Sequence, residues 1–214
     1  MNNDDIVITS AFRTAIGSFG GSLASQTAPQ LGAAVIKKCL EHSELKNDEV
    51  DMIYMGQVLT TGAGQNPARQ AAMQAGIAKE KTATTINQVC GSGLASIALA
   101  YNSIKCKDGS IMIAGGQESM SNSPHYMHLR NGIKMGIGEM QDSMIVDGLW
   151  DTYNQYHMGI TAENVAEQFQ IKRETQDDFA AASQRKATEA IAGKKFKDEI
   201  VPVTVKIKKQ DVIF

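Results

Sequence analysis

Cys90 has the surroundings of a nucleophile. It follows the strand-like run TATTINQV (82–89) and precedes an alanine-rich run with the composition of a helix. A thiol reacts as a nucleophile when it is ionised, and the unpaired amides at a helix N-terminus favour its thiolate form. Gly91 and Gly93 leave room for a substrate beside the sulfur, and their amides are candidates to hold the oxyanion of an attacked carbonyl. The alternative is a buried structural cysteine at a tight strand-to-helix turn.

The same stretch nearly matches a dinucleotide-binding fingerprint. In GSGLAS (91–96) the place of the third glycine is taken by Ser96. The strand expected next, SIMIAGG (110–116), ends without the carboxylate that would bind a ribose. Both departures disfavour nucleotide binding.

The elements that must position Cys90 alternate between strand and helix. Short β-branched runs predict buried strands, and apolar residues at helical spacing predict helices. The expected strands are 6–12, 51–59, 82–89 and 110–116, and the expected helices are 28–45, 68–76 and the run after Cys90. This alternation predicts an α/β fold with a parallel sheet covered by helices on both faces. Cys90 then lies at the carboxyl edge of the sheet, where ligands bind in open α/β folds.

The chain changes in composition after Gly116. Residues 117–160 are rich in Met, Gly, Ser, Asn and His and show little periodicity, as is typical of functional or interface loops. Helices are expected at 161–169 and 173–192, and EIVPVTVKIKK (199–209) alternates like a half-exposed strand. We therefore expect two units, an α/β domain over 1–116 and an inserted, loop-rich domain over 117–214.

Bulk composition excludes several classes of function. The chain has 214 residues, a net charge of −2 and no block of Lys or Arg, which disfavours nucleic acid and anionic membranes as partners. No apolar run approaches the roughly 20 residues that span a bilayer, and the polar start MNNDDIVITS does not look like a presequence. Three widely spaced cysteines form no metal-ligand pair and predict free thiols in a reducing, cytoplasmic setting, without a metal or redox cofactor.

Five blocks of the sequence resemble the thiolase family. NQVCGSGLASIALA (87–100) resembles the nucleophile motif of thiolases, and GGQESMSNSPH (115–125) resembles the segment that follows it. Three further blocks match in the right order: RTAIGSFGGSL (13–23), QNPARQAAMQAG (65–76) and YHMGITAENVAEQ (156–168). The resemblance implies a thiolase-like fold, in which this chain supplies the first of two repeats as a parallel-rich mixed sheet with an inserted α/loop-rich region. The Asn-Gln before Cys90 and the Gly-Ser-Gly after it favour thiolases over the related ketoacyl synthases.

The resemblance assigns roles to particular residues. It makes Cys90 the nucleophile that carries the acetyl group, in the condensation of two acetyl-CoA to acetoacetyl-CoA and in the reverse thiolysis. It places His157 and Met158 in the pocket for the pantetheine and acetyl groups, and Tyr156-His157-Met158-Gly159 resembles the biosynthetic branch. Coenzyme A thioesters are then substrates rather than cofactors. Taken alone, His157 is equally well read as a hydrogen-bonded histidine of the loop region, and Met158 as ordinary packing.

The catalytic acid–base groups of the family are missing from this sequence. Thiolases use a histidine in a Gly-His-Pro context and a second cysteine in a Cys-x-Gly context, and neither motif is present here. Each such group contributes roughly 10²–10⁴-fold to a rate. We therefore expect the N-terminal portion of an acetyl-CoA C-acetyltransferase, nearly inactive alone, that associates with itself or with a complementing C-terminal half. The alternative is a degenerate fragment that binds coenzyme A without turnover.

Overall fold

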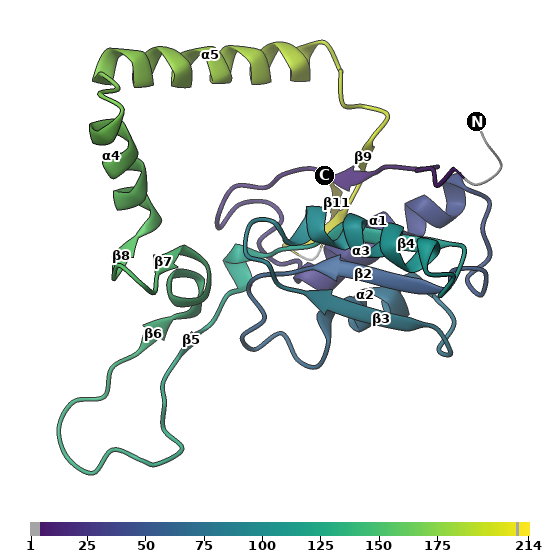
Figure 1. Ribbon diagram of the computed structural model, residues 1–214, viewed down its shortest axis with the longest axis horizontal. Coiled ribbons are helices and arrows are strands. Elements are labelled where there is room, and N and C mark those ends of the chain that lie inside the picture. Colours follow the sequence, from purple (N-terminus) through teal and green to yellow (C-terminus); the bar gives the residue numbers. More distant parts are fainter. Residues whose placement is uncertain (1–4, 209) are drawn as a thin grey trace.

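The computed structural model describes residues 5–208 and 210–214, and a three-stranded parallel sheet lies at its centre. The strands are β2 (Met52–Gly56), β3 (Thr82–Ile86) and β4 (Met112–Gly116), in the order β3-β2-β4. In the register of the sheet, Ile53 pairs with Ala83 on one side and with Ile113 on the other. The predicted parallel sheet is therefore confirmed (Figure 1).

Helices cover both faces of this sheet, as predicted. They are α1 (Ala28–His42), α2 (Pro67–Ala75) and α3 (Ser92–Lys105). Successive side chains of a strand point to opposite faces, so β2 contacts different helices through alternate residues. Ile53 and Met55 are buried in one cluster with Ile36 of α1 and Ala71 of α2. On the other face, the Tyr54 hydroxyl lies 2.9 Å from Oγ of Ser103 in α3.

The expected strand at residues 6–12 does not form. Val7 and Ile8 are 54% and 76% exposed, and the first strand is the short β1 (Arg13–Thr14). A β-branched run becomes a strand only where a sheet edge lies beside it, because its preference reflects packing on a pleated surface. Within the described residues, no strand pairs with 6–12. The composition of this run fits a strand, but among the described residues it has no neighbouring strand to pair with.

The end of the chain returns to its beginning. β9 (Ile200–Val201) pairs in parallel with β1, and β10 (Thr204–Ile207) forms an antiparallel hairpin with β11 (Gln210–Ile213). Val203 and Val205 are buried against Leu23, whereas the alternate residues face outward. The predicted alternation is confirmed for Val201, Val203 and Val205, but Ile207 is 42% exposed. The single strand expected here is divided into β9 and β10, which pair with different partners.

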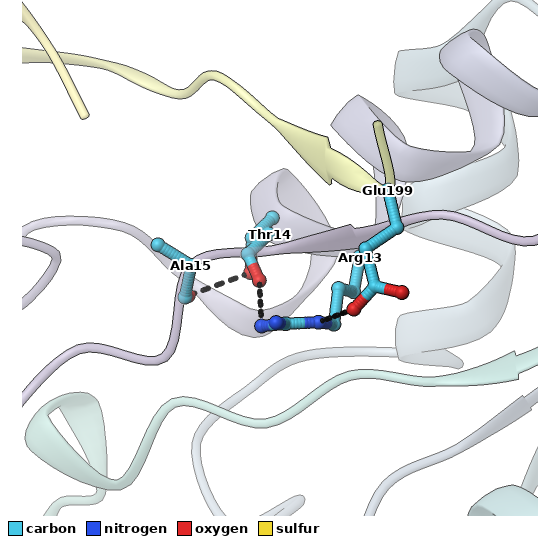
Figure 2. Close-up of polar contacts among 4 residues, drawn as sticks. All are labelled: Arg13, Thr14, Ala15 and Glu199. Atoms are coloured by element: carbon cyan, nitrogen blue, oxygen red, sulfur yellow. Dashed lines mark hydrogen bonds and ion pairs between the residues drawn. The ribbon is translucent and has the colours of Figure 1, made fainter. Parts of the chain in front are cut away.

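An ion pair fastens this return. Arg13 Nε lies 2.5 Å from Oε1 of Glu199 (Figure 2). The Arg13 backbone N–H also donates to the Glu199 carbonyl at 2.9 Å. The Arg13 guanidinium also lies 5.0 Å from the centroid of the Phe196 ring. One arginine therefore holds the two distant segments through its charge, its backbone and its planar face.

After β4 the short 3-10 helix Met120–Asn122 stays bound to the loop before α1. From β5 to β9 the chain extends away from the sheet as an arm, which we define as residues 125–199 (Figure 1). Two small antiparallel pairs begin it, β5 (His125–Tyr126) with β6 (Gln141–Asp142) and β7 (Trp150–Asp151) with β8 (Tyr156–His157), with the π-helix Ile145–Leu149 between them. Two helices follow, α4 (Met158–Gln168) and α5 (Arg173–Ala192). Among their residues, all of which the structure describes, Ala190 alone is buried. The division of the chain at residue 116 stays a prediction.

No helix in the described part of the chain is long and apolar enough to cross a membrane.

Candidate functional site

The Cys90 thiol is exposed at the mouth of a helix. The residue follows the carboxyl end of β3 and comes two positions before Ser92, the first residue of α3. This is the carboxyl edge of the parallel sheet, as the sequence predicted. A buried structural cysteine does not describe such a side chain. An exposed thiol at a helix N-terminus is within reach of an electrophile.

The turn that carries Cys90 is held by side chains. Val89 has a φ of 47°, a left-handed conformation that is a genuine outlier for a β-branched residue. The Asn87 side-chain oxygen accepts from the Val89 N–H at 2.9 Å. The Ser92 hydroxyl accepts from the Gln88 N–H at 2.8 Å and donates to the Val89 carbonyl at 2.6 Å. Such conformations persist only where the surroundings enforce them, and here Asn87 and Ser92 do so.

Glycines at the ends of two strands let α3 come close to the sheet. A Cβ on Gly56, at the end of β2, would lie 2.6 Å from the Ser92 carbonyl carbon and 2.7 Å from its Cβ. A Cβ on Gly116, at the end of β4, would lie 3.5 Å from the Gly93 Cα. Any side chain at position 56 would therefore push the first turn of α3, and Cys90 with it, off the strand ends.

Ser96 ties the same helix to β4. Its fully buried hydroxyl lies 2.6 Å from the Gly93 carbonyl and 2.8 Å from the Gly115 carbonyl, which share its single proton. This contact accounts for a serine where a dinucleotide fingerprint would have its third glycine. The buried residues of α3 are all small: Ser92, Ser96, Ala100 and Ser103.

Sequence reasoning missed the structural roles of Ser92 and Ser96. The available signal was two serines four residues apart in a run, 92–100, that otherwise contains only glycine and apolar residues, since residues at that spacing share a face. The large apolar side chains of α3 point outward instead, with Leu94 76%, Ile97 42% and Tyr101 48% exposed.

The two glycines predicted to support an oxyanion differ in their surroundings. The Gly91 N–H donates to the Gln88 carbonyl at 3.0 Å, so this amide closes the turn and would have to exchange that partner for a substrate oxygen. Gly93 opens onto free space, because a Cβ there would meet nothing within 4 Å. The oxyanion role of both residues stays a prediction.

His157 and Met158 lie on the arm, at the junction of β8 and α4 (Figure 1). His157 caps α4, because its Nδ1 accepts from the Gly159 N–H at 3.0 Å. This is the hydrogen-bonded histidine that the sequence left open as an alternative. Both side chains are exposed, and among the described residues no hydrogen bond or ion pair joins either to Cys90. Their place in a substrate pocket stays a prediction.

Glu118 joins the loops at the same edge of the sheet. This carboxylate, just after β4, accepts from the Val58 N–H at 2.8 Å and from the Leu59 N–H at 3.2 Å. Burial raises the pKa of Glu118, although these amides partly offset the effect. The next contact leads to the arm, since the Thr61 hydroxyl donates to Asp147 at 2.7 Å. The ends of β2 and β4 are thereby fixed beside the turn that carries Cys90.

The other two cysteines have different surroundings. All three cysteines lie in the described part of the chain and are free thiols. Cys39 is half-buried in α1, and burial raises the pKa of its thiol, which favours the neutral form. Cys106 is exposed at the opposite end of α3 from Cys90. Within the same described residues, no group of three or more His, Cys, Asp or Glu is placed to hold a metal ion.

Comparison with known proteins gives one consistent result. Residues 6–214 match the family model described as the thiolase N-terminal domain. An acetyl-CoA acetyltransferase of Cupriavidus necator is 56% identical over 98% of this chain and 53% of its own length. Proteins of the same name from Rhizobium meliloti and Pseudomonas aeruginosa are each 55% identical, over 99% and 94% of this chain. The chain spans about half the length of these relatives.

Proposed function

Because its residues 6–214 match the N-terminal domain, this chain belongs to the thiolase family, and we propose that it is the N-terminal portion of an acetyl-CoA acetyltransferase. In that role Cys90 receives the acetyl group. One observation carries the proposal: the nucleophile motif of a chain 56% identical to such an enzyme folds with its thiol exposed at the carboxyl edge of the sheet.

The proposed step is an acyl transfer between two thiols. The Cys90 thiolate attacks the carbonyl carbon of acetyl-CoA, a carbon–sulfur bond forms at Cys90, and the bond to the coenzyme A sulfur breaks. Coenzyme A leaves as its thiolate and takes up one proton, equivalent to the proton that Cys90 lost. A second acetyl-CoA then loses one proton, and the resulting carbanion attacks the acetyl carbonyl on Cys90. The carbon–sulfur bond to Cys90 breaks, acetoacetyl-CoA is formed, and the Cys90 thiolate takes up one proton to become a thiol again. Thiolysis runs through the same acetyl-Cys90 in reverse.

Other groups of the site follow from the same proposal. We assign coenzyme A contacts to His157 and Met158, and oxyanion support to the amides of Gly91 and Gly93, with no cofactor beyond the thioester substrate. The acid–base groups for the second half of the reaction belong to a complementing thiolase half, in a homo-oligomer or a mixed assembly. The outward apolar face of α3 supports association, since large exposed apolar patches mark interaction surfaces. Free thiols support a reducing, cytoplasmic setting.

Acetylation of the chain by acetyl-CoA tests this function. Intact-mass spectrometry of the purified chain should show slow addition of one acetyl group. Cys90→Ala should abolish the addition, and Cys106→Ala, which removes the exposed thiol at the other end of α3, should not. Acetylation that persists in Cys90→Ala contradicts the assignment. Binding of coenzyme A without any acetylation supports the degenerate-fragment alternative.

The thiolysis of acetoacetyl-CoA tests the second part of the proposal. The chain alone should turn over this substrate far more slowly than a complete thiolase, because positioned acid–base groups contribute roughly 10²–10⁴-fold each. Rapid thiolysis by the chain alone would show that its own residues supply those groups.

A further inference from the structure

The turn around Cys90 contains a strained residue, Val89, and two side chains that constrain it, Asn87 and Ser92. Val89 has a φ of 47°, and the residue that follows it is the candidate nucleophile. For a residue other than glycine the left-handed conformation costs about 1–2 kcal/mol, and β-branched residues adopt it rarely. Without a constraint Val89 would return to a negative φ and would rotate Cys90 relative to α3.

Asn87 holds only the Val89 N–H, whereas Ser92 constrains the turn with both of its hydrogen-bonding functions. Its hydroxyl accepts from the Gln88 N–H and donates to the Val89 carbonyl, so it holds the backbone on both sides of the strained residue. Ser92 itself is 4% exposed and cannot shift, because it lies directly against Gly56.

We propose that Ser92 is a positioning residue for Cys90: its buried hydroxyl holds Val89 in the left-handed conformation and thereby fixes the thiol outward at the mouth of α3. The proposal rests on the proposed role of Cys90 as the nucleophile. Ser92 does not touch the substrate and acts through the backbone of the turn. Ser92 raises the fraction of molecules in which the Cys90 thiol points outward. The apparent rate of reaction at Cys90 is proportional to that fraction.

Alkylation of single cysteines by iodoacetamide measures this presentation without acetyl-CoA. The rate at Cys90 is read by peptide mass mapping, with the exposed Cys106 of the same helix as internal reference. In Ser92→Ala the Cys90 rate should fall about tenfold, which corresponds to the cost of a left-handed residue, and the Cys106 rate should not change. Ser96→Ala is the matched control, because it removes a buried hydroxyl one turn later that bonds to Gly93 and Gly115 rather than to the turn. It should lower the melting temperature and leave the Cys90 rate unchanged.

A second substitution separates positioning from general damage. Glycine adopts a positive φ without strain, so Val89→Gly in the Ser92→Ala background should restore the Cys90 rate. An unchanged rate in Ser92→Ala, or a failure of Val89→Gly to restore it, overturns the proposal. If Ser92→Ala does not fold, Val89→Gly in the otherwise wild-type chain tests whether Val89 is strained. It should melt no lower than the wild type and keep its Cys90 rate, and a lower melting temperature would show that Val89 is not strained.

The two proposals fail in different ways. If wild-type Cys90 is not acetylated by acetyl-CoA but the alkylation rates follow the expected order, the acyltransferase function fails and the positioning by Ser92 stands. If acetylation occurs at Cys90 and its alkylation rate is the same in wild type and Ser92→Ala, the acyltransferase function stands and the positioning by Ser92 fails.

Discussion

Asp51 joins the starts of two strands through one carboxylate. Its Oδ2 accepts from the backbone N–H groups of Ser110 at 2.7 Å and Ile111 at 3.1 Å, and the Lys81 ammonium lies 3.7 Å from Oδ1. The hydrogen bond from Ser110, then that from Ile111, holds the pKa of Asp51 below its ordinary value, with a smaller contribution from Lys81. The ionised form therefore stabilises the edge of the sheet opposite Cys90.

Asp51→Asn should destabilise the chain by about 1 kcal/mol near neutral pH, because a neutral amide replaces a charged acceptor. A carboxylate whose pKa is lowered by folding contributes stability above its unfolded value of about 3.9, and that contribution is lost as pH falls through the folded-state pKa. Urea unfolding at several pH values should thus show a gap between wild type and variant that closes in acid. Glu80→Gln, at an exposed carboxylate, is the control. A gap that stays constant with pH contradicts the role of the charge.

The contact between Gly56 and the first turn of α3 makes a prediction for a strand and a helix together. Gly56→Ala would place a methyl group 2.6 Å from the Ser92 backbone, and overpacking of this kind costs typically 1–3 kcal/mol. Gly93→Ala, in the same helix turn, meets nothing within 4 Å and should gain up to about 1 kcal/mol from helix propensity. Denaturant unfolding measures both changes. Equal changes in the free energy of unfolding for the two substitutions would show that α3 does not pack directly against Gly56 of β2.

The elements around Cys90 were predictable because their patterns are local. Each central strand is a short apolar or β-branched run, and each helix an alanine-rich run or one with apolar residues at helical spacing. Recognising these patterns needs no knowledge of the rest of the fold. Residues 6–12 show the limit of such local patterns. This run has the composition of a strand but forms none, because among the described residues no sheet edge lies beside it. Cys90 was identified from adjacent glycines. The role of Ser92 depends on Gly56, a residue brought to it only by the folded sheet.

In the molecule as a whole, the first and last segments depend on each other. β1 pairs with β9, and the Arg13–Glu199 ion pair spans them (Figure 2). The two side chains are 36% and 44% exposed, and exposed ion pairs contribute only about 0.2–1 kcal/mol.

A double-mutant cycle with Arg13→Ala and Glu199→Ala should give a coupling free energy in that range. The value should shrink as salt is added, because exposed charges are screened. Arg13→Ala alone should cost more than Glu199→Ala, since it also removes the contact with the Phe196 ring. A coupling of zero at low salt would show that the ion pair does not help to hold the two segments together.

The arm begins near the central sheet and, because β9 pairs with β1, it also ends against the α/β part of the chain, so both of its ends are attached there (Figure 1). A protease that cuts once among the exposed residues between Phe169 and Lys172 would therefore sever the polypeptide without separating its pieces. The nicked product should migrate as one species under native conditions and as two bands in detergent. The segment that carries His157 would then be attached to the rest of the molecule only at its N-terminal end, and its position relative to the Cys90 turn would no longer be fixed from both sides.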